Sequence, residues 1–309
     1  MKLLFAFVLC VTLNFCFAQD PAFTAKDVSI NTFIDGTLLT PNGNNTTQLA
    51  IIIAGSGPTD RNGNQNFLKN NALKKLAEGL TNNGIATFRY DKRIVKQILK
   101  NDVDPNIRFD DFVTDATSVI AYFKEEAEFK KIYVIGHSQG SLVGMLASKQ
   151  NVAGFVSLAG AGQTIDEVIV NQVAAMDSTL VPPAIKAFER LKQGETTTDY
   201  PAVLGSIFRA DVQPFMMNWM QYHPQDIIKN LDIPVLIVNG SKDLQVSVDE
   251  AKLLEQASDN ADLKIIDRMN HVLFIITGGN LENSKSYNES FRPISTELVD
   301  VVSEFIKRD

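Results

Sequence analysis

Cysteine and histidine are scarce in this chain of 309 residues, which has two cysteines and three histidines. Cys10 and Cys16 both lie near the start, so the rest of the chain offers no disulfide and no thiolate nucleophile. The histidines (His137, His223 and His271) are far apart, and none belongs to an H-E-x-x-H motif. These shortages argue against a disulfide scaffold and against a zinc protein, and we expect no bound metal.

Positively charged residues are also fewer than negatively charged ones. Lysine and arginine number 29 against 36 aspartates and glutamates, the formal net charge is −7, and no dense basic run is present. Nucleic acids and anionic membranes are bound through such basic patches, so we expect neither as a partner. A phosphate-binding P-loop motif is absent, and Gly55-Ser56-Gly57 lacks the rest of a dinucleotide-binding fingerprint. The sequence therefore predicts a protein that needs no nucleotide or other cofactor.

Apolar runs long enough to cross a bilayer are missing too. The run at residues 3–13 follows Lys2 and is too short for a membrane-spanning helix, and the small residue Ala18 closes the segment. This pattern is typical of a secretory signal peptide, so we expect residues 1–18 to be removed after Ala18. The protein would then be periplasmic or secreted, without a stable membrane anchor. The alternatives are a buried N-terminal strand or helix and a lipoprotein signal at Cys16, where a bulky phenylalanine precedes the cysteine.

Short apolar runs rich in β-branched residues alternate with helical patterns along residues 19–309. Several of these runs, such as IIIA and VLIV, are continuous, as is typical of strands buried on both faces. Such alternation predicts one α/β domain with a mostly parallel, doubly wound sheet. The expected strands are 32–39, 49–54, 85–90, 131–135, 153–158, 234–238 and 263–266, and the expected helices are 71–82, 109–128, 248–257 and 294–306.

One stretch, about residues 162–232, interrupts this alternation because it has helical patterns and no convincing strand. It lies between two expected strands, so we interpret it as a helical cap inserted into the sheet domain; an ordinary helical excursion of the core is the alternative. The stretch contains the run PFMMNWMQY. These large apolar side chains would either line a substrate pocket or pack the cap onto the core.

The motif Gly136-His137-Ser138-Gln139-Gly140 follows the expected strand KIYVI and precedes the helical run SLVGMLASKQ. A G-x-S-x-G motif between a strand and a helix is typical of a nucleophile elbow, a sharp turn that exposes the serine hydroxyl. The turn leaves no space for side chains two positions before and after the serine, which explains a glycine at both places. Ser138 is therefore the predicted nucleophile.

With this motif the chain resembles the α/β-hydrolase superfamily, and in particular bacterial secreted hydrolases of the serine-aminopeptidase-like and acyl-esterase-like kind. The resemblance covers nearly all of residues 19–309 and implies an α/β-hydrolase fold with a Ser-Asp-His triad. One departure is that Ile94-Val95-Lys96 follows the RYDKR segment, where a glycine-rich turn is usual. The similar segments are GSGPTDR (55–61), RYDKR (89–93), GHSQG (136–140), GSKDLQV (240–246) and NHVLF (270–274).

A serine hydroxyl needs a base to accept its proton, and histidine is the best base near neutral pH. In this fold the nucleophile comes first in the chain, the acid second and the histidine last. His271 follows the last expected strand and satisfies this order. His137 is next to the nucleophile, so its side chain should point elsewhere, and His223 precedes the strand after which the acid is expected.

The acid of the triad should lie just past the penultimate strand. Asp243 follows PVLIVN within Gly240-Ser241-Lys242-Asp243, and we predict that it binds and orients His271. Asp249 and Asp267 are the alternatives. Asp249 opens the next expected helix, where a carboxylate is common for structural reasons, and Asp267 is only four residues before His271.

Catalysis by an activated serine also needs donors for the oxyanion that forms on the substrate. We expect one to be the backbone N–H of Gln139 and the other to come from the loop Gly55-Ser56-Gly57-Pro58, with Ser56 preferred and Gly57 the alternative. Asp60 and Arg61 are expected to form an ion pair in that loop. The charged side chains of the segment 89–93 are expected to be structural.

These residues predict a serine hydrolase that cleaves carboxylic esters through an acyl-serine intermediate. Its substrate would be a small-molecule ester or an acylated carbohydrate. One alternative is a peptidase or amidase with the same triad. Another is a non-catalytic binding protein on a hydrolase scaffold, although all three triad residues are present.

Overall fold

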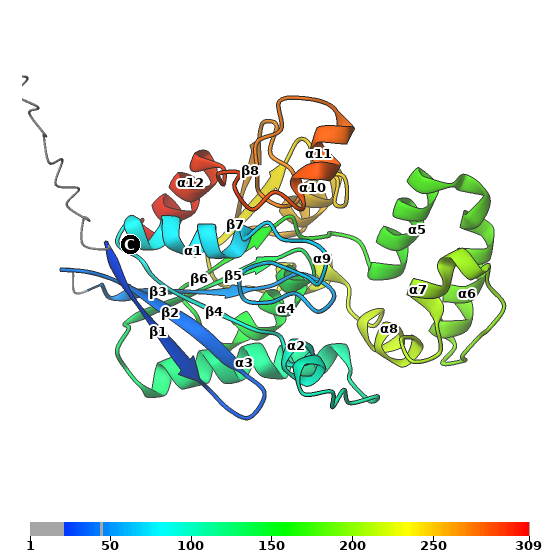
Figure 1. Ribbon diagram of the computed structural model, residues 1–309, viewed down its shortest axis with the longest axis horizontal. Coiled ribbons are helices and arrows are strands. Elements are labelled where there is room, and N and C mark those ends of the chain that lie inside the picture. The colour runs from blue at the N-terminus through cyan, green and yellow to red at the C-terminus, as the bar shows by residue number, and fades with distance from the viewer. Residues whose placement is uncertain (1–21, 44–45, 309) are drawn as a thin grey trace, which may run out of the picture.

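A single eight-stranded sheet runs through the computed structural model, which describes residues 22–43 and 46–308 (Figure 1). The strand order is β1-β2-β4-β3-β5-β6-β7-β8. The pairs β1–β2 and β2–β4 are antiparallel and the other pairs are parallel, which confirms the predicted α/β class. The expected signal peptide lies outside the described residues. The strands are β1 (Phe23–Ser29), β2 (Asp35–Pro41), β3 (Gln48–Ile53), β4 (Ala86–Tyr90), β5 (Lys131–His137), β6 (Gly154–Leu158), β7 (Val235–Gly240) and β8 (Ala261–Ile266).

Helices cover both faces of the sheet, and each strand of the centre sends alternate side chains to the two sides. In β3, Ile51 and Ile53 belong to one apolar cluster, while Ala50 and Ile52 belong to the other. This explains the continuous apolar runs of the sequence. α3 (Phe109–Glu125), α4 (Gln139–Ala147), α9 (Pro224–Lys229) and α10 (Val248–Ala257) pack on the first cluster, and α1 (Ala72–Asn82) and α12 (Thr296–Lys307) pack on the second. The remaining helices of the sheet domain are α2 (Arg93–Leu99), α11 (Asn280–Ser286) and the 3₁₀ turn η1 (Ser148–Gln150).

Residues 162–232, all of which the structure describes, contain helices and no strand. The first part has a small core of its own, formed by side chains such as Phe188, Leu191 and Phe208. Figure 1 shows α5 to α8 beside the sheet domain rather than on a face of the sheet. α9 instead packs Ile227 and Ile228 into the main core, so the separately packed cap ends with α8. The cap consists of α5 (Ile165–Met176), η2 (Ser178–Leu180), α6 (Val181–Lys192), η3 (Ala202–Leu204), α7 (Gly205–Phe208) and α8 (Gln213–Trp219).

The cap is joined to the sheet domain where α8 meets α3. Trp219 stacks on Phe109 with ring centroids 5.4 Å apart and an interplanar angle of 8°. The hydroxyl of Tyr222 donates a hydrogen bond of 2.5 Å to Asp110, and the Asn218 amide donates one of 3.1 Å to the same carboxylate. This seam accounts for part of the aromatic and polar character of the run PFMMNWMQY.

Within residues 22–43 and 46–308, no helix has both the length and the apolar character that crossing a bilayer would require.

Candidate active site

The candidate nucleophile, Ser138, lies in the tight turn between β5 and α4. Its backbone has φ 54° and ψ −122°, a conformation that costs free energy in any residue other than glycine. A Cβ atom on Gly136 would lie 2.2 Å from the carbonyl oxygen of Gly140, and one on Gly140 would lie 2.5 Å from that of Ile53. Both glycines are therefore required by the turn, as the sequence motif indicates.

The structure brings two of the predicted triad residues together. Asp243 lies in the turn after β7 and His271 in the loop after β8, and Asp243 Oδ2 is 2.8 Å from His271 Nδ1. The side chains are only 1% and 5% exposed. Asp243 Oδ1 accepts hydrogen bonds from the backbone N–H groups of Gln245 (2.8 Å) and Val246 (2.9 Å). Because a carboxylate only accepts, Nδ1 of His271 carries the proton and Nε2 presents a lone pair.

The alternative acids lie apart from this pair. Asp249 lies in the first turn of α10, binds Lys252 at 2.9 Å and has a side chain that is 82% exposed. Asp267 accepts a hydrogen bond of 3.1 Å from Ser241, and its side chain is 80% exposed. The geometry thus favours Asp243 as the partner of His271.

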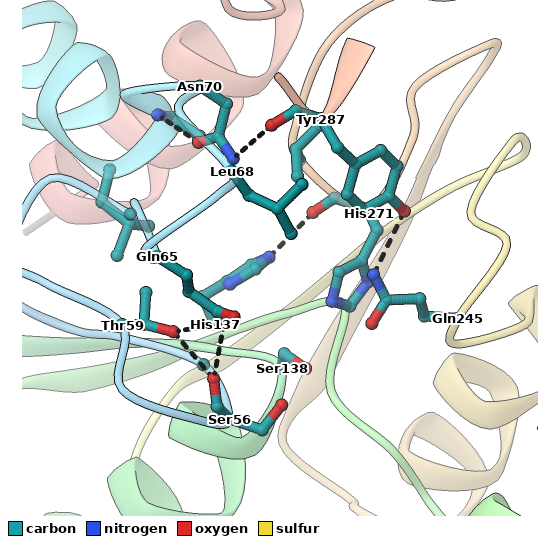
Figure 2. A pocket seen from close by; sticks show the side chains of 15 residues that line it. Ser56, Thr59, Gln65, Leu68, Asn70, His137, Ser138, Gln245, His271 and Tyr287 are labelled. Carbon is teal, nitrogen blue, oxygen red and sulfur yellow. Dashed lines mark hydrogen bonds between the residues drawn. The ribbon is translucent and has the colours of Figure 1, made fainter. Parts of the chain in front are cut away.

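Ser138 and His271 line the same small cavity of about 90 Å³ (Figure 2). The cavity lies between the loop that follows β3 and the loop that follows β8. His137 lines it as well, with its ring centroid 4.9 Å from that of His271. His137 Nε2 donates a hydrogen bond of 2.8 Å to the carbonyl oxygen of His271. Burial lowers the pKa of His137 to about 4, helped by repulsion from His271 whenever that ring is protonated, so His137 stays neutral near pH 7. Its side chain supports the loop that carries His271, a role that no sequence signal indicated.

His223 occupies a different place. It is an exposed residue just before α9 and lines neither of the cavities next to Ser138.

The predicted oxyanion donors, Ser56 and Gln139, flank Ser138 and line a second, larger cavity with it. Gln139 is the first residue of α4, where a backbone N–H has no partner within the helix. The carbonyl oxygen of Ser56 accepts hydrogen bonds from the side chains of Thr59 (2.7 Å) and Gln65 (3.0 Å), which fix the loop. Figure 2 shows these two side chains converging on Ser56. The alternative donor, Gly57, lines neither cavity, so the geometry favours Ser56.

The charged side chains near this loop pair differently from the prediction. Arg61 binds Asp91 at 2.5 Å and 2.8 Å, whereas Asp60 accepts the backbone N–H groups of Asn62 (2.8 Å) and Asn64 (2.9 Å). The expected ion pair between Asp60 and Arg61 is therefore wrong. The short side chain of Asp60 turns back onto its own loop, and Arg61 reaches the end of β4 instead.

The second cavity has a volume of about 290 Å³ and extends from Ser138 toward the cap. Met216 and Trp219 of α8 line it, whereas Phe215 packs against Phe112 of α3 with ring centroids 5.6 Å apart. The apolar run of the cap therefore serves both of the roles expected for it. The apolar wall of this cavity consists of Leu142, Ala161, Ile165, Val168, Ile169, Ile207, Met216, Trp219, Pro224 and Val246.

Comparison with known proteins identifies the family of the chain. Residues 69–275 match the family model described as serine aminopeptidase, S33. The chain belongs to this family.

Esterase EstD of Thermotoga maritima is a curated relative, 28% identical over 265 residues. The match covers 82% of this chain and 61% of EstD, so the chain spans about three fifths of that relative's length. Est1E from Butyrivibrio proteoclasticus has a similar structure, with a TM-score of 0.56, 20% identity and coverage of 91% of this chain and 98% of Est1E. The esterase Pf2001 of Pyrococcus furiosus also has a similar structure, with a TM-score of 0.56 and 16% identity. The match covers 93% of this chain and 91% of Pf2001. These two structures show the α/β-hydrolase fold.

Proposed function

We propose that the protein is a serine hydrolase that cleaves carboxylic esters through an acyl-serine intermediate. The observation that carries this proposal is the buried pair of Asp243 and His271, because His271 lines the same cavity as Ser138, which lies on a strained turn. Membership of a hydrolase family supports it, as does similarity to proteins that are described as esterases.

In the proposed reaction, Ser138 Oγ attacks the ester carbonyl while His271 Nε2 takes the hydroxyl proton. The backbone N–H groups of Ser56 and Gln139 bind the oxyanion of the tetrahedral intermediate. His271 then gives the proton to the departing alcohol, and the acyl group stays on Ser138. A water molecule, activated by His271, attacks the acyl-serine and releases the acid. Asp243 holds the imidazole in orientation and stabilises its charged form throughout.

The two cavities suggest how a substrate would lie. The larger cavity is mainly apolar, and its polar lining residues, such as Gln163, Gln172 and Ser206, are uncharged. Such a wall favours an apolar acyl group, with the alcohol directed to the smaller cavity. A solved structure of Est1E has ferulic acid bound, so we include aromatic acyl groups among the substrates to test. Acylated carbohydrates are included on the basis of the sequence prediction.

Filling the larger cavity should shorten the acyl chain that the enzyme accepts. Ile169→Trp on α5 places an indole at a position that lines this cavity. We expect kcat/KM for long-chain p-nitrophenyl esters to fall about tenfold or more, with acetyl ester hydrolysis nearly unchanged, because each methylene bound in an apolar pocket contributes about 1–3 kcal/mol. Ile185→Trp is the matched control, since Ile185 is 41% exposed on α6 of the same cap. A uniform loss for every chain length in Ile169→Trp would contradict the assignment of the acyl site.

A peptidase with the same triad is the second candidate, because the matching family model is described as a serine aminopeptidase. An aminopeptidase must bind the ammonium group of its substrate, which favours carboxylates near the nucleophile. The residues that line the two cavities include no aspartate or glutamate, in the part of the chain that the structure describes. Parallel assays with p-nitrophenyl esters and aminoacyl p-nitroanilides test the two functions, and faster turnover of the anilides would favour the peptidase.

We also propose that the protein is exported after cleavage behind Ala18, on the basis of the N-terminal sequence. The expected mature chain begins at Gln19. Intact mass measurement of protein recovered from the periplasm or culture medium tests this, and exported protein that retains residues 1–18 would refute the cleavage site.

A further inference from the structure

Lys92 is a buried lysine directly behind the candidate oxyanion site. It follows β4 and is 4% exposed. Its Nζ donates hydrogen bonds to the carbonyl oxygen of Gly55 (3.0 Å) and to Oε1 of Gln139 (2.7 Å), and it lies 4.1 Å from the ring centroid of Phe112. Lys92 lines neither of the two cavities next to Ser138, so it approaches these groups from the side away from substrate.

This placement is costly for the stability of the fold. Both hydrogen-bond acceptors of Lys92 are uncharged, and the carboxylate of nearby Asp115 is bound by Arg93 at 2.7 Å and 2.8 Å. Burial lowers the pKa of Lys92 to about 7, against the opposing attraction of Asp115. Without a carboxylate partner, the amine regains little of the free energy that it loses when water is removed. Burying an apolar side chain at this position would cost less free energy. A role beyond folding is therefore expected.

The two acceptors of Lys92 are attached to the two proposed oxyanion donors. The Gly55 carbonyl belongs to the same peptide group as the Ser56 N–H, and in a trans peptide these bonds point in opposite directions. A hydrogen bond that holds the Gly55 oxygen behind the site thus directs the Ser56 N–H away from Lys92. The same hydrogen bond polarises the Gly55–Ser56 peptide and so makes the Ser56 N–H a stronger donor. The second bond holds the side chain of Gln139, whose own N–H is the other donor.

We propose that Lys92 is a positioning residue that orients the Ser56 and Gln139 amides toward the oxyanion of the transition state. The inference rests on the proposed serine hydrolase function. Lys92 forms no bond with the substrate, and it acts through the Gly55–Ser56 peptide and the first residue of α4. Its effect should therefore fall on kcat, since the oxyanion develops only in the transition state.

The test compares Lys92→Met with Lys75→Met. Methionine keeps the apolar stem of the lysine and removes the amine. Lys75 is a matched control because its Nζ also donates hydrogen bonds to backbone carbonyls, those of Asn70 (3.0 Å), Ser290 (2.7 Å) and Arg292 (2.5 Å), and lies over the ring of Phe274. The readouts are kcat and KM on a p-nitrophenyl ester, the rate of inactivation by a fluorophosphonate, and the melting temperature. The fluorophosphonate reports on the oxyanion donors without any need for the correct ester.

In Lys92→Met we expect kcat and the inactivation rate to fall together by about 10- to 100-fold, with KM within about twofold, because misplaced donors weaken only transition-state binding. The melting temperature should change little, because the loss of two hydrogen bonds opposes the gain from removing a buried amine. Lys75→Met should keep its kcat and melt at a lower temperature. Gln139→Leu should give a smaller loss, and in the Lys92→Met background it should add little, because it acts through the same amine.

Three results would overturn the inference. The first is an unchanged inactivation rate in Lys92→Met, and the second is an equal loss of kcat in Lys75→Met. The third is an unchanged kcat in Gln139→Leu. This variant tests the positioning role of Lys92 if Lys92→Met does not fold. A wild-type protein that reacts with neither esters nor the fluorophosphonate would instead refute the proposed function, and the role of Lys92 with it. A wild type that reacts with the fluorophosphonate but cleaves no ester would refute the substrate class alone.

Discussion

Replacing Ser138 by alanine is expected to lower kcat for ester hydrolysis by about 10⁴-fold or more, and His271→Ala should have a similar effect. Without the hydroxyl there is no nucleophile, and without the imidazole nothing takes its proton. The two residues act as one unit, so the double variant should lose little more than either single variant. Steady-state kinetics of the three proteins on one ester check this, with melting curves to show that all are folded. Losses that multiply in the double variant would mean that one residue lies outside the triad.

The second large effect is expected for Asp243→Asn, which should lower kcat on the order of 10³- to 10⁴-fold while the protein stays folded. The structure explains why the amide is a poor substitute. Oδ1 of Asp243 accepts two backbone N–H groups, from Gln245 and Val246, so the oxygen of asparagine must remain on that side. Its NH₂ group then faces Nδ1 of His271, where a donor favours the wrong tautomer and the stabilising charge is lost.

Asp249→Asn is the control for this prediction. Its carboxylate lies in the first turn of α10 and contributes about 0.3–1 kcal/mol to stability. We expect kcat of that variant to be unchanged. The acid assignment fails if Asp249→Asn is the inactive protein and Asp243→Asn hydrolyses esters normally, and in that case the roles of Ser138 and His271 would still stand.

The sequence predicted the interior strands of the sheet and the β8 edge, but it did not predict β1 at the other edge. Strands β3, β5 and β7 contain continuous apolar runs, because their residues are buried on both faces, and this pattern is visible without a structure. Strand β1 was missed because it is largely exposed and polar, with Lys26 and Asp27 at its centre. It forms through pairing with β2, in a register from Phe23 opposite Pro41 to Ser29 opposite Asp35. Such pairing leaves no periodicity in the sequence.

In the candidate site, too, residues marked by a local sequence pattern were predicted, whereas contacts that depend on the tertiary structure were not. Ser138 is marked by a local motif, and its glycine requirement follows from the turn. Asp243 and His271 were placed by their positions after strands, which the sequence reveals. Lys92 was interpreted as structural, as the charges of a strand-end segment usually are. Its contacts with Gly55 and Gln139 depend on three separate segments meeting behind the turn, which a pattern of residue types does not encode.

An acyl group is expected to form on Ser138 during ester hydrolysis. The direct measurement is mass analysis of peptides after rapid acid quenching of the protein with a p-nitrophenyl ester, alongside the time course of p-nitrophenol release. We predict an initial burst of p-nitrophenol and an acyl adduct on the peptide that contains Ser138, with both absent in Ser138→Ala. Turnover of the ester by Ser138→Ala at the wild-type rate, or an acyl adduct on a different residue, would contradict the account.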